Sequence, residues 1–367
     1  SVQSEPHRFD PYLRALANEW QLLREETGWD DSDQCLTSIY VGGGTPSVLG
    51  SVRLRGLLDI FRDPSRWADD CEITVELNPE GASYELFTGL LAAGYSRFSL
   101  GLQSFRDAEL SLLGRGHDAQ QGREAVHAAR RAGCRNLNLD LMYGLPGQSI
   151  EQWTTSLQEA IALEPAHISC YLLTLEEETI LHQLLHGGEL ETPFDEILLK
   201  QYMVTRDLAL AAGFEHYEIS NFARPGFRCR HNVATWRRRP YYGLGPAAHS
   251  FDGALRWCNA ANLTVYLEHL LEAPRRPPRE RYSLTPADEA KEMILLGLRM
   301  AEGLKWSALE GVTARGALAR LRRRARLLYG TGFLNMDAEG LRLAPQAYFV
   351  SNSVFVELIR ALEEDDS

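Results

Sequence analysis

The 367-residue chain lacks several features that would place it in well-defined classes of protein. It has no apolar run of 18 or more residues and no recognisable secretion signal, so we expect neither a membrane span nor export, but a cytoplasmic location. Its closest cysteine pair, Cys229 and Cys258, is 29 positions apart, which excludes short metal-binding spacings and predicts reduced thiols. Cations are few: 38 Lys and Arg against 50 Asp and Glu give a net charge of −12, which disfavours nucleic-acid binding.

A run of three glycines is the first positive signal. The apolar segment 38–41 ends at Gly42, Gly43 and Gly44, which are followed by Thr45 and Pro46. Glycines leave no side chain between the backbone and a molecule above the strand end, as a site requires when main-chain groups contact a ligand. A plain tight turn is the alternative interpretation.

Strand-like and helical segments alternate along the first half of the chain. Strands are expected at 37–41, 72–77, 97–102, 136–142 and 167–173, and helices at 11–25, 51–61, 84–93, 119–132 and 149–163. This alternation predicts an α/β fold of parallel strands with crossover helices. A barrel is favoured over an open doubly wound sheet because Glu76, Gln103 and Asp140 end three strands, where a barrel builds its active site.

These three polar residues also have simpler explanations one by one. Glu76 could face solvent, and Asp140 could be a core carboxylate bound by backbone N–H groups. Burying unpaired polar groups costs roughly 2–7 kcal/mol apiece, so three of them beside a triple-glycine turn indicate a polar, hydroxyl-rich ligand.

The second half of the chain predicts a separate small domain. A helix at 194–212 and a strand at 216–220 precede a Pro- and Arg-rich linker at 273–281, and helices at 286–300, 314–328 and 350–363 surround a hairpin at 332–343. We therefore expect domains at 1–272 and 282–367, the second resembling a winged helix. Overall acidity and the acidic tail at 363–366 argue against DNA binding and favour a lid or a partner-docking module.

Five motifs, at 42–47, 76–79, 99–105, 140–148 and 217–222, resemble those of radical SAM proteins related to oxygen-independent coproporphyrinogen III oxidase. Within that family the chain is most similar to the haem-chaperone branch. The resemblance covers essentially the whole chain, in the family's order. It implies a partial (β/α)6-type radical SAM barrel with a small C-terminal α+β domain.

The resemblance also implies residues that bind S-adenosylmethionine (SAM). Gly43, Gly44 and Thr45 match the turn that contacts its amino-acid end, and Glu76 matches a SAM-contacting carboxylate. The other matching pocket positions are Gln103, Arg115, Asp140, Leu172 and His249. A carboxylate suits hydroxyls or an ammonium group, and Arg115 suits a carboxylate, although it could also be a plain surface residue of a loop.

A departure from the family concerns its [4Fe–4S] cluster. Family members hold the cluster on a CxxxCxxC loop and leave one iron for SAM, in keeping with thiolate ligation of such clusters. Ser1 falls just after the place of that loop, so we expect roughly 20 residues, one strand plus loop, to be missing from the sequence. A natural member that has lost its cluster is the alternative. No metal ligand or catalytic residue is assigned within the sequence.

A His-Asn pair carries the proposed haem site. The haem-chaperone branch has a His-Asn-x-x-Tyr motif proposed to bind haem, which His231 and Asn232 match, with Thr235 in place of the tyrosine. An imidazole is a suitable axial ligand, but His231 could equally hydrogen-bond its own loop. The flanking arginines could meet haem propionates or form a solvated face; they are Arg228, Arg230 and Arg237 to Arg239.

Two functions follow from the resemblance. The first is a haem chaperone that binds haem and transfers it to acceptor proteins, with SAM and a [4Fe–4S] cluster as cofactors. The second is oxidative decarboxylation of coproporphyrinogen III, so whether the protein is an enzyme stays open. The expected partners are haem or another tetrapyrrole and an acceptor protein, not nucleic acid.

Overall fold

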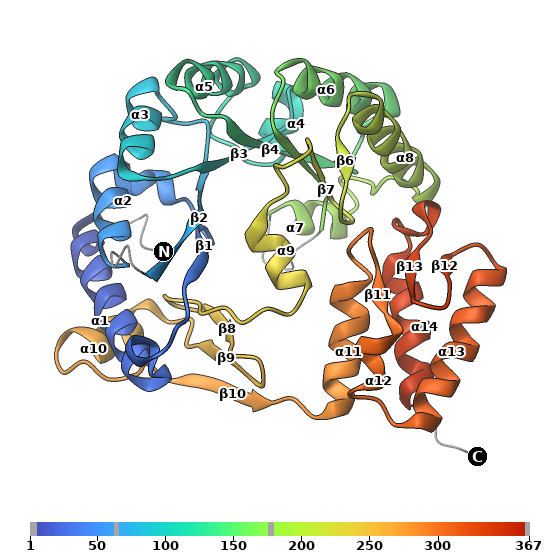
Figure 1. Ribbon diagram of the computed structural model, residues 1–367. Coiled ribbons are helices and arrows are strands. Elements are labelled where there is room, and N and C mark those ends of the chain that lie inside the picture. The colour runs from blue at the N-terminus through green and yellow to red at the C-terminus, as the bar shows by residue number, and fades with distance from the viewer. Residues whose placement is uncertain (1–5, 62–65, 175–179, 364–367) are drawn as a thin grey trace. The chain divides into compact units, whose positions relative to one another are not determined.

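The computed structural model describes residues 6–61, 66–174 and 180–363. The expected junction with a cluster loop at Ser1, and most of the acidic tail, lie outside the described residues. The chain divides into two compact units (Figure 1). The sheet unit is Tyr40–Ser47 and Ile73–Cys229, and the discontinuous unit is Ser1–Ile39, Val48–Glu72 and Arg230–Ser367.

Within the described residues, the largest sheet has seven strands in the order β1-β2-β3-β4-β5-β7-β6. Its strands are β1 (Leu36–Val41), β2 (Trp67–Leu77), β3 (Arg97–Gln103), β4 (Asn136–Tyr143), β5 (His167–Leu172), β6 (Glu215–His216) and β7 (Asn221–Ala223). Strands β2 to β5 are parallel, whereas β7 runs antiparallel to β5. The predicted α/β partial barrel with parallel strands is confirmed.

Helices connect these strands, namely α3 (Tyr84–Ala93), α4 (Asp107–Leu112), α5 (Ala119–Ala132), α6 (Ile150–Ala162), α7 (Ile180–His186) and α8 (Asp195–Ala211). Of these, α3, α5, α6 and α8 cover the outer side of the sheet (Figure 1). Helices α5 and α6 begin with capping boxes at Asp118 and Ser149, and α5 ends at Gly133, whose φ of 92° suits glycine. Every residue of β3 is buried, so this strand is covered on both faces of the sheet.

The strand predicted at 216–220 is wrong. Strand β6 ends at His216 and β7 begins at Asn221, with a turn between them. The Glu218 carboxylate accepts the N–H of Ser220, and the Glu218 carbonyl accepts the N–H of Asn221. This local hydrogen bonding competes with strand pairing, because a short acceptor can satisfy the backbone within a turn.

The discontinuous unit combines helices with two small sheets. Its elements are α1 (Phe9–Thr27), α2 (Gly50–Asp59), α9 (Arg230–Trp236), β8 (His249–Phe251), β9 (Leu255–Asn259), α10 (Leu263–Leu271), β10 (Arg279–Ser283), α11 (Pro286–Gly297), β11 (Leu304–Lys305), α12 (Trp306–Glu310), α13 (Arg315–Gly330), β12 (Leu334–Met336), β13 (Gly340–Leu343) and α14 (Ser351–Glu363). Short 3-10 helices span Pro6–Arg8, Trp29–Asp31, Pro46–Leu49 and Pro345–Ala347. Antiparallel pairing of β12 with β13 confirms the predicted hairpin.

The predicted linker at 273–281 is wrong over its last three residues, which belong to a strand. Residues from Arg279 onward form β10, which pairs antiparallel with β9. The Arg279 guanidinium lies 5.2 Å from the centroid of the Trp257 ring and pairs with Glu26, so this arginine packs within a sheet. The division into domains 1–272 and 282–367 stays a prediction.

A buried carboxylate joins separate parts of the discontinuous unit. Glu19 on α1 is only 3% exposed. It accepts hydrogen bonds from the Tyr266 hydroxyl at 2.6 Å, the Gly245 N–H at 2.8 Å and the Asn259 amide at 2.6 Å. Burial raises the pKa of the Glu19 carboxyl above its ordinary value. The same helix contributes Trp20 to an apolar cluster whose other fully buried members are Leu23, Trp29 and Trp257.

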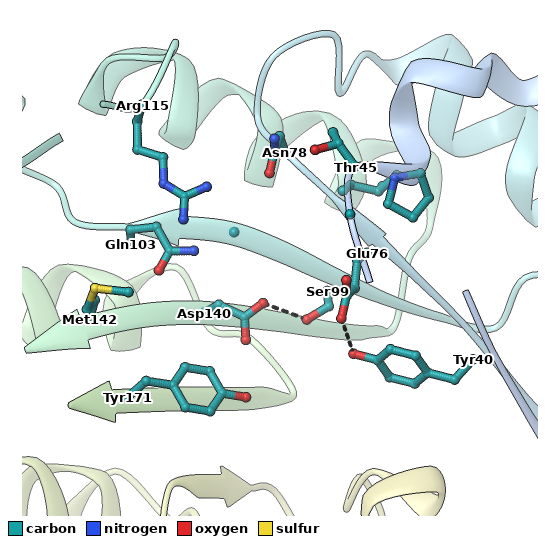
Figure 2. A pocket seen from close by; sticks show the side chains of 14 residues that line it. Tyr40, Thr45, Glu76, Asn78, Ser99, Gln103, Arg115, Asp140, Met142 and Tyr171 are labelled. Atoms are coloured by element: carbon teal, nitrogen blue, oxygen red, sulfur yellow. Dashed lines mark hydrogen bonds between the residues drawn. The ribbon is translucent and has the colours of Figure 1, made fainter. Parts of the chain in front are cut away.

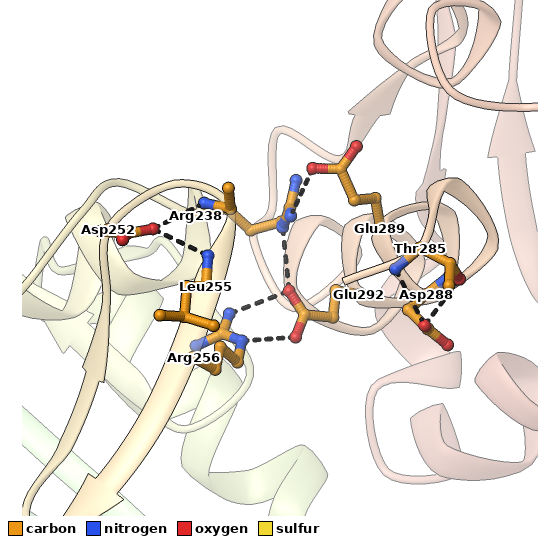
Figure 3. A network of polar contacts seen from close by, with 9 residues as sticks. Arg238, Asp252, Leu255, Arg256, Thr285, Asp288, Glu289 and Glu292 are labelled. Atoms are coloured by element: carbon orange, nitrogen blue, oxygen red, sulfur yellow. Dashed lines mark hydrogen bonds and ion pairs between the residues drawn. The ribbon is translucent and has the colours of Figure 1, made fainter. Parts of the chain in front are cut away.

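An ion-pair network fixes the end of α9 to α11 (Figure 3). Arg238, which follows α9, pairs with Glu289 at 3.2 Å and with Glu292 at 3.1 Å. Arg256 on β9 holds Glu292 with two nitrogens, at 2.5 and 2.9 Å. Both guanidinium groups also lie against the Phe251 ring, at 5.3 and 4.2 Å from its centroid. The partly buried Glu292 therefore receives charge-assisted hydrogen bonds from two arginines at once.

Replacing Glu292 with alanine is expected to destabilise the protein by about 2–3 kcal/mol, because both arginines lose a shielded partner. Urea unfolding followed by circular dichroism would measure the change. The control is Glu310→Ala, which removes a single exposed pair with Arg322 and should cost less than about 1 kcal/mol. Equal losses in the two variants would contradict the importance assigned to the network.

Candidate functional site

A pocket of about 360 Å³ opens at the carboxyl ends of the parallel strands (Figure 2). The end of β1 and the turn after it supply one wall, the ends of β2, β3, β4 and β5 supply most of the rest, and the loop between α4 and α5 adds Arg115. The lining residues are Tyr40, Gly44, Thr45, Pro46, Glu76, Leu77, Asn78, Ser99, Gly101, Gln103, Arg115, Asp140, Met142 and Tyr171. Six of the ten residues predicted from the sequence therefore surround one cavity.

The glycine run and Glu76 fit closely together. The Tyr40 hydroxyl donates to Glu76 Oε1 at 2.7 Å, and the Gly43 N–H donates to Oε2 at 3.2 Å. A Cβ on Gly42 would lie 2.7 Å from the Glu76 carboxylate and from the Tyr40 ring, and Gly43 has a φ of +84°. Any larger residue at Gly42 would displace Glu76, so the turn is shaped around this carboxylate.

Burial raises the pKa of Glu76, and the nearby carboxylate of Asp140 adds to the shift. The Tyr40 hydroxyl has its pKa raised by burial and by Glu76, so it stays protonated and donates. A bound cation at this carboxylate would relieve its desolvation. The site is thus disposed to accept a hydroxyl or ammonium donor.

Asp140 is held by one neighbour on β3 and by another on its own strand, β4. Its Oδ2 accepts from Ser99 at 2.8 Å, and its Oδ1 accepts from the Asn138 amide at 2.8 Å (Figure 2 shows the Ser99 bond). The Asn138 carbonyl oxygen lies 2.5 Å from Nδ1 of His167, whose Nε2 lies 2.8 Å from the Tyr217 hydroxyl. Asp140 thus projects from a buried network with a fixed orientation.

The charge state of His167 follows from its position. Complete burial, with a further contribution from Arg97, holds the pKa of His167 well below its ordinary value, so the imidazole is neutral. Because Asn138 offers a carbonyl oxygen, Nδ1 carries the proton and Nε2 accepts from Tyr217. Sequence reasoning missed Asn138, Ser99 and His167. The signal that could have identified Asn138 is the alternation of polar residues along β4, at Asn136, Asn138 and Asp140.

Gln103 ends β3 in an unusual conformation. Its φ is +65°, and the register between β3 and β4 shifts between Leu100 and Gln103. A left-handed non-glycine residue at a strand end is a conformation that functional sites retain despite its strain. This conformation places the Gln103 side chain in the pocket lining, toward which Arg115 extends in Figure 2.

Arg115 supplies the positive charge of the pocket lining. Burial lowers its pKa, whereas Glu80 and Asp140 act in the opposite direction. A guanidinium beside two carboxylates stays charged and can hold a further anion, such as a substrate carboxylate.

The remaining predicted residues lie elsewhere. Leu172 follows the lining residue Tyr171 and sits where a side chain on Gly144 would have to go, its Cδ1 2.5 Å from an ideal Cβ there. His249 lies in β8 and His231 in α9, both in the discontinuous unit. The His231 N–H donates to Glu72 at 3.4 Å, and its carbonyl accepts from Thr235, the residue that replaces the tyrosine of the motif.

The flanking arginines have acidic partners. Arg230 pairs with Asp70 at 2.5 Å and Arg237 pairs with Glu302 at 2.7 Å. Arg228 pairs with Glu215 at 3.0 Å. Together with Arg238, four of the five arginines predicted as a basic patch are thus partly neutralised by carboxylates.

Known proteins match the chain along most of its length. Residues 20–160 match the Radical SAM superfamily, and residues 284–350 match the HemN C-terminal domain. A Mycobacterium tuberculosis (strain H37Rv) protein named "Heme chaperone HemW" is 36% identical over 351 residues, which cover 95% of this chain and 86% of that protein. The chain belongs to the HemW family of radical SAM proteins. The Bacillus subtilis HemW is 34% identical over 83% of this chain and 78% of its own length.

The fold has a solved counterpart. A structure described as "Coproporphyrinogen III oxidase (HemN) from Escherichia coli is a Radical SAM enzyme" aligns with a TM-score of 0.79 and 21% identity, over 96% of this chain and 84% of that one. This likeness confirms the radical SAM fold predicted from the motifs. Among the described residues of this HemW-family chain, no helix is long and apolar enough to cross a bilayer.

Membership of the radical SAM superfamily implies SAM and a [4Fe–4S] cluster. The pocket fits SAM, because carboxylates, a guanidinium and an open glycine turn face one polar cavity. The described residues do not fit the cluster: they contain no group of three or more His, Cys, Asp or Glu placed to hold a metal ion. All six cysteines are free, and burial raises the pKa of the Cys134 thiol to about 12, which makes it a poor ligand.

Proposed function

We propose that this protein binds haem and passes it to acceptor proteins, with SAM held in the pocket at the strand ends. The observation that carries the proposal is the match to proteins named heme chaperone HemW over 95% of the chain. The His231-Asn232 pair on α9 supports haem binding. The six free cysteines favour a reducing compartment, so we also propose a cytoplasmic location.

The pocket residues would divide the recognition of SAM among them. Glu76 and Asp140 would accept hydrogen bonds from its ammonium and ribose hydroxyls, and Arg115 would hold its carboxylate. Gly43, Gly44 and Thr45 would offer main-chain groups to its amino-acid end. When bound, SAM supplies a sulfonium group that makes its attached carbons reactive. The protein's own contribution is the fixed orientation of Asp140 and the buried carboxylate of Glu76.

His231 would be the axial ligand of haem. The partners of its flanking arginines bear on how a propionate could bind. Arg230 and Arg237 each pair with an exposed carboxylate, and such pairs contribute little on their own. A propionate could therefore replace either carboxylate.

The test is haem titration of the full chain with His231→Ala, followed by the Soret band. We expect at least about a tenfold loss of affinity and a changed Soret maximum, because a neutral imidazole is an axial ligand that alanine cannot replace. His127→Ala, on the exposed side of α5, is the matched control and should bind haem as the unaltered chain does. An unchanged Soret band and affinity for His231→Ala would disprove the assignment of the ligand.

Coproporphyrinogen oxidation is the second candidate, supported by the fold match to HemN and by the HemN C-terminal domain at residues 284–350. Haem binding without turnover would favour the chaperone. Decarboxylated product from a cluster-containing preparation supplied with SAM would favour the oxidase.

A further inference from the structure

A second cleft lies in the sheet unit, on residues that the proposed SAM pocket does not use. Its volume is about 650 Å³. It forms where the loop after β4 and the first turn of α6 face the segment that leads into α8. The lining residues are Pro146, Gly147, Gln148, Ser149, Ile150, Glu151, Glu189, Leu190, Glu191, Thr192, Pro193, Phe194 and Ile197.

The cleft carries an apolar surface open to solvent. Phe194 is 79% exposed, the largest exposed fraction of any aromatic residue described. Ile197 lies one helical turn further along α8, and Ile150 and Leu190 complete the apolar lining. An exposed phenylalanine with aliphatic neighbours forms a contiguous apolar patch, which is typical of an interaction site, whereas single exposed apolar residues are common on any protein surface.

The charge around this surface is of one sign. Residues 136–199 contain eleven Asp and Glu and no Lys or Arg. Glu151, Glu189 and Glu191 line the cleft, and none of them forms an ion pair within the described part of the chain. By contrast, Glu159 and Glu164 in the same stretch pair with Arg123 and Arg130. The cleft carboxylates therefore remain available for cations from outside.

The first turn of α6 does not offset this negative charge. Ser149 caps the helix by accepting the Gln152 N–H, and Gln152 in turn accepts the Ser149 N–H. Helix N–H groups that are already paired are poor anion sites. An anionic ligand, a nucleic acid or an acidic lipid surface would meet repulsion here.

We propose that this cleft docks an extended segment of a partner protein in which an apolar side chain lies between Lys or Arg residues. The apolar side chain packs against Phe194 and Ile197, and the flanking cations meet Glu151, Glu189 and Glu191. Apolar burial supplies affinity, while the carboxylates speed association and select basic partners. The inference depends on neither haem nor SAM.

The experiment uses the full chain and fluorescein-labelled peptides in fluorescence anisotropy. The parent peptide is Gly-Lys-Arg-Leu-Lys-Arg-Gly; one comparison peptide replaces Leu with Ser, and the other replaces all four cations with Glu. We expect the parent to bind, and both altered peptides to bind at least about tenfold more weakly. Raising the salt concentration should weaken binding of the parent. Absence of binding by the parent, or equal binding of the Ser peptide, would overturn the proposal.

Variants then locate the site. Phe194→Ser and the double variant Glu189→Lys/Glu191→Lys should each lower affinity for the parent about tenfold or more. Glu164→Lys changes the charge of the same acidic stretch at a position that does not line the cleft, and it should leave affinity within about twofold, since an exposed charge that does not contact the peptide is screened by salt. All four positions are exposed, so the fold should persist, which circular dichroism checks. If Glu164→Lys weakens binding as much as the cleft variants do, the attraction is diffuse and the docking site is refuted.

Discussion

Replacing Glu19 with alanine is expected to lower the free energy of unfolding by about 3–5 kcal/mol. The substitution leaves the Tyr266 hydroxyl, the Asn259 amide and the Gly245 N–H without their acceptor in a buried site. Each unsatisfied donor costs about 1–3 kcal/mol. This cost is only partly offset, because the variant no longer pays the desolvation penalty of burying a carboxylate. Urea unfolding monitored by circular dichroism measures the loss.

Glu25→Ala, six positions along α1, is the control for this prediction. Glu25 is exposed and accepts a hydrogen bond from Gln21, so its removal should change stability by less than about 0.5 kcal/mol. If Glu19→Ala costs no more than Glu25→Ala, the buried carboxylate does not hold α1 in place.

The pH dependence of stability tests the same group. Burial raises the folded-state pKa of Glu19 above its ordinary value of 4.5, so at pH values between the two the folded chain holds a proton that the unfolded chain has lost. Its contribution to stability is thus full below about pH 4.5 and declines as the pH rises to the folded pKa. Glu19→Gln cannot ionise and should flatten that decline. Identical slopes in the two proteins would contradict the assignment.

Replacing Glu76 with glutamine should weaken SAM binding by about 10–100-fold, or roughly 1.4–2.7 kcal/mol. The change keeps the shape of the side chain but removes the negative charge, and it puts an amide nitrogen where either the Gly43 N–H or the Tyr40 hydroxyl now donates. Isothermal titration calorimetry of the full chain with SAM gives the affinity directly.

Glu124→Gln is the matched control for the pocket. Glu124 is an exposed carboxylate on α5 and is not part of the pocket lining. It should bind SAM within about twofold of the unaltered chain, since a screened surface charge contributes little. Unweakened binding by Glu76→Gln, with thermal stability preserved, would remove Glu76 from the proposed site.

Much of the site could be predicted because parallel strands end at one edge. The sequence places three polar residues at the ends of three different strands, namely Glu76, Gln103 and Asp140. Crossover connections bring the ends of parallel strands together at one edge of the sheet. The network behind Asp140 could not be predicted, because it depends on register. Ser99 lies opposite Asn138, and Asn138 lies opposite His167, pairings that only the assembled sheet defines.

The arginines around His231 show a second limit. Their positions were visible in the sequence, but their partners are distant along the chain: Arg230 meets Asp70, and Arg237 meets Glu302. A local sequence pattern shows how many cationic side chains are present. It does not show which of them pair with carboxylates, because those partners are brought close only by the tertiary structure. For the same reason the sequence left both a propionate site and a solvated face open for these arginines.

The discontinuous unit has a consequence for synthesis on the ribosome. Glu19 and the apolar face of α1 pair with Gly245, Asn259 and Tyr266, which are 226 to 247 positions later in the chain. At roughly 5–20 residues per second, α1 waits about 10–50 seconds for these partners, while each strand from β2 to β5 can pair with the strand made just before it. During that interval Trp20 and Leu23 lack Trp257, the late member of their apolar cluster, so this part of the nascent chain keeps apolar surface exposed to aggregation.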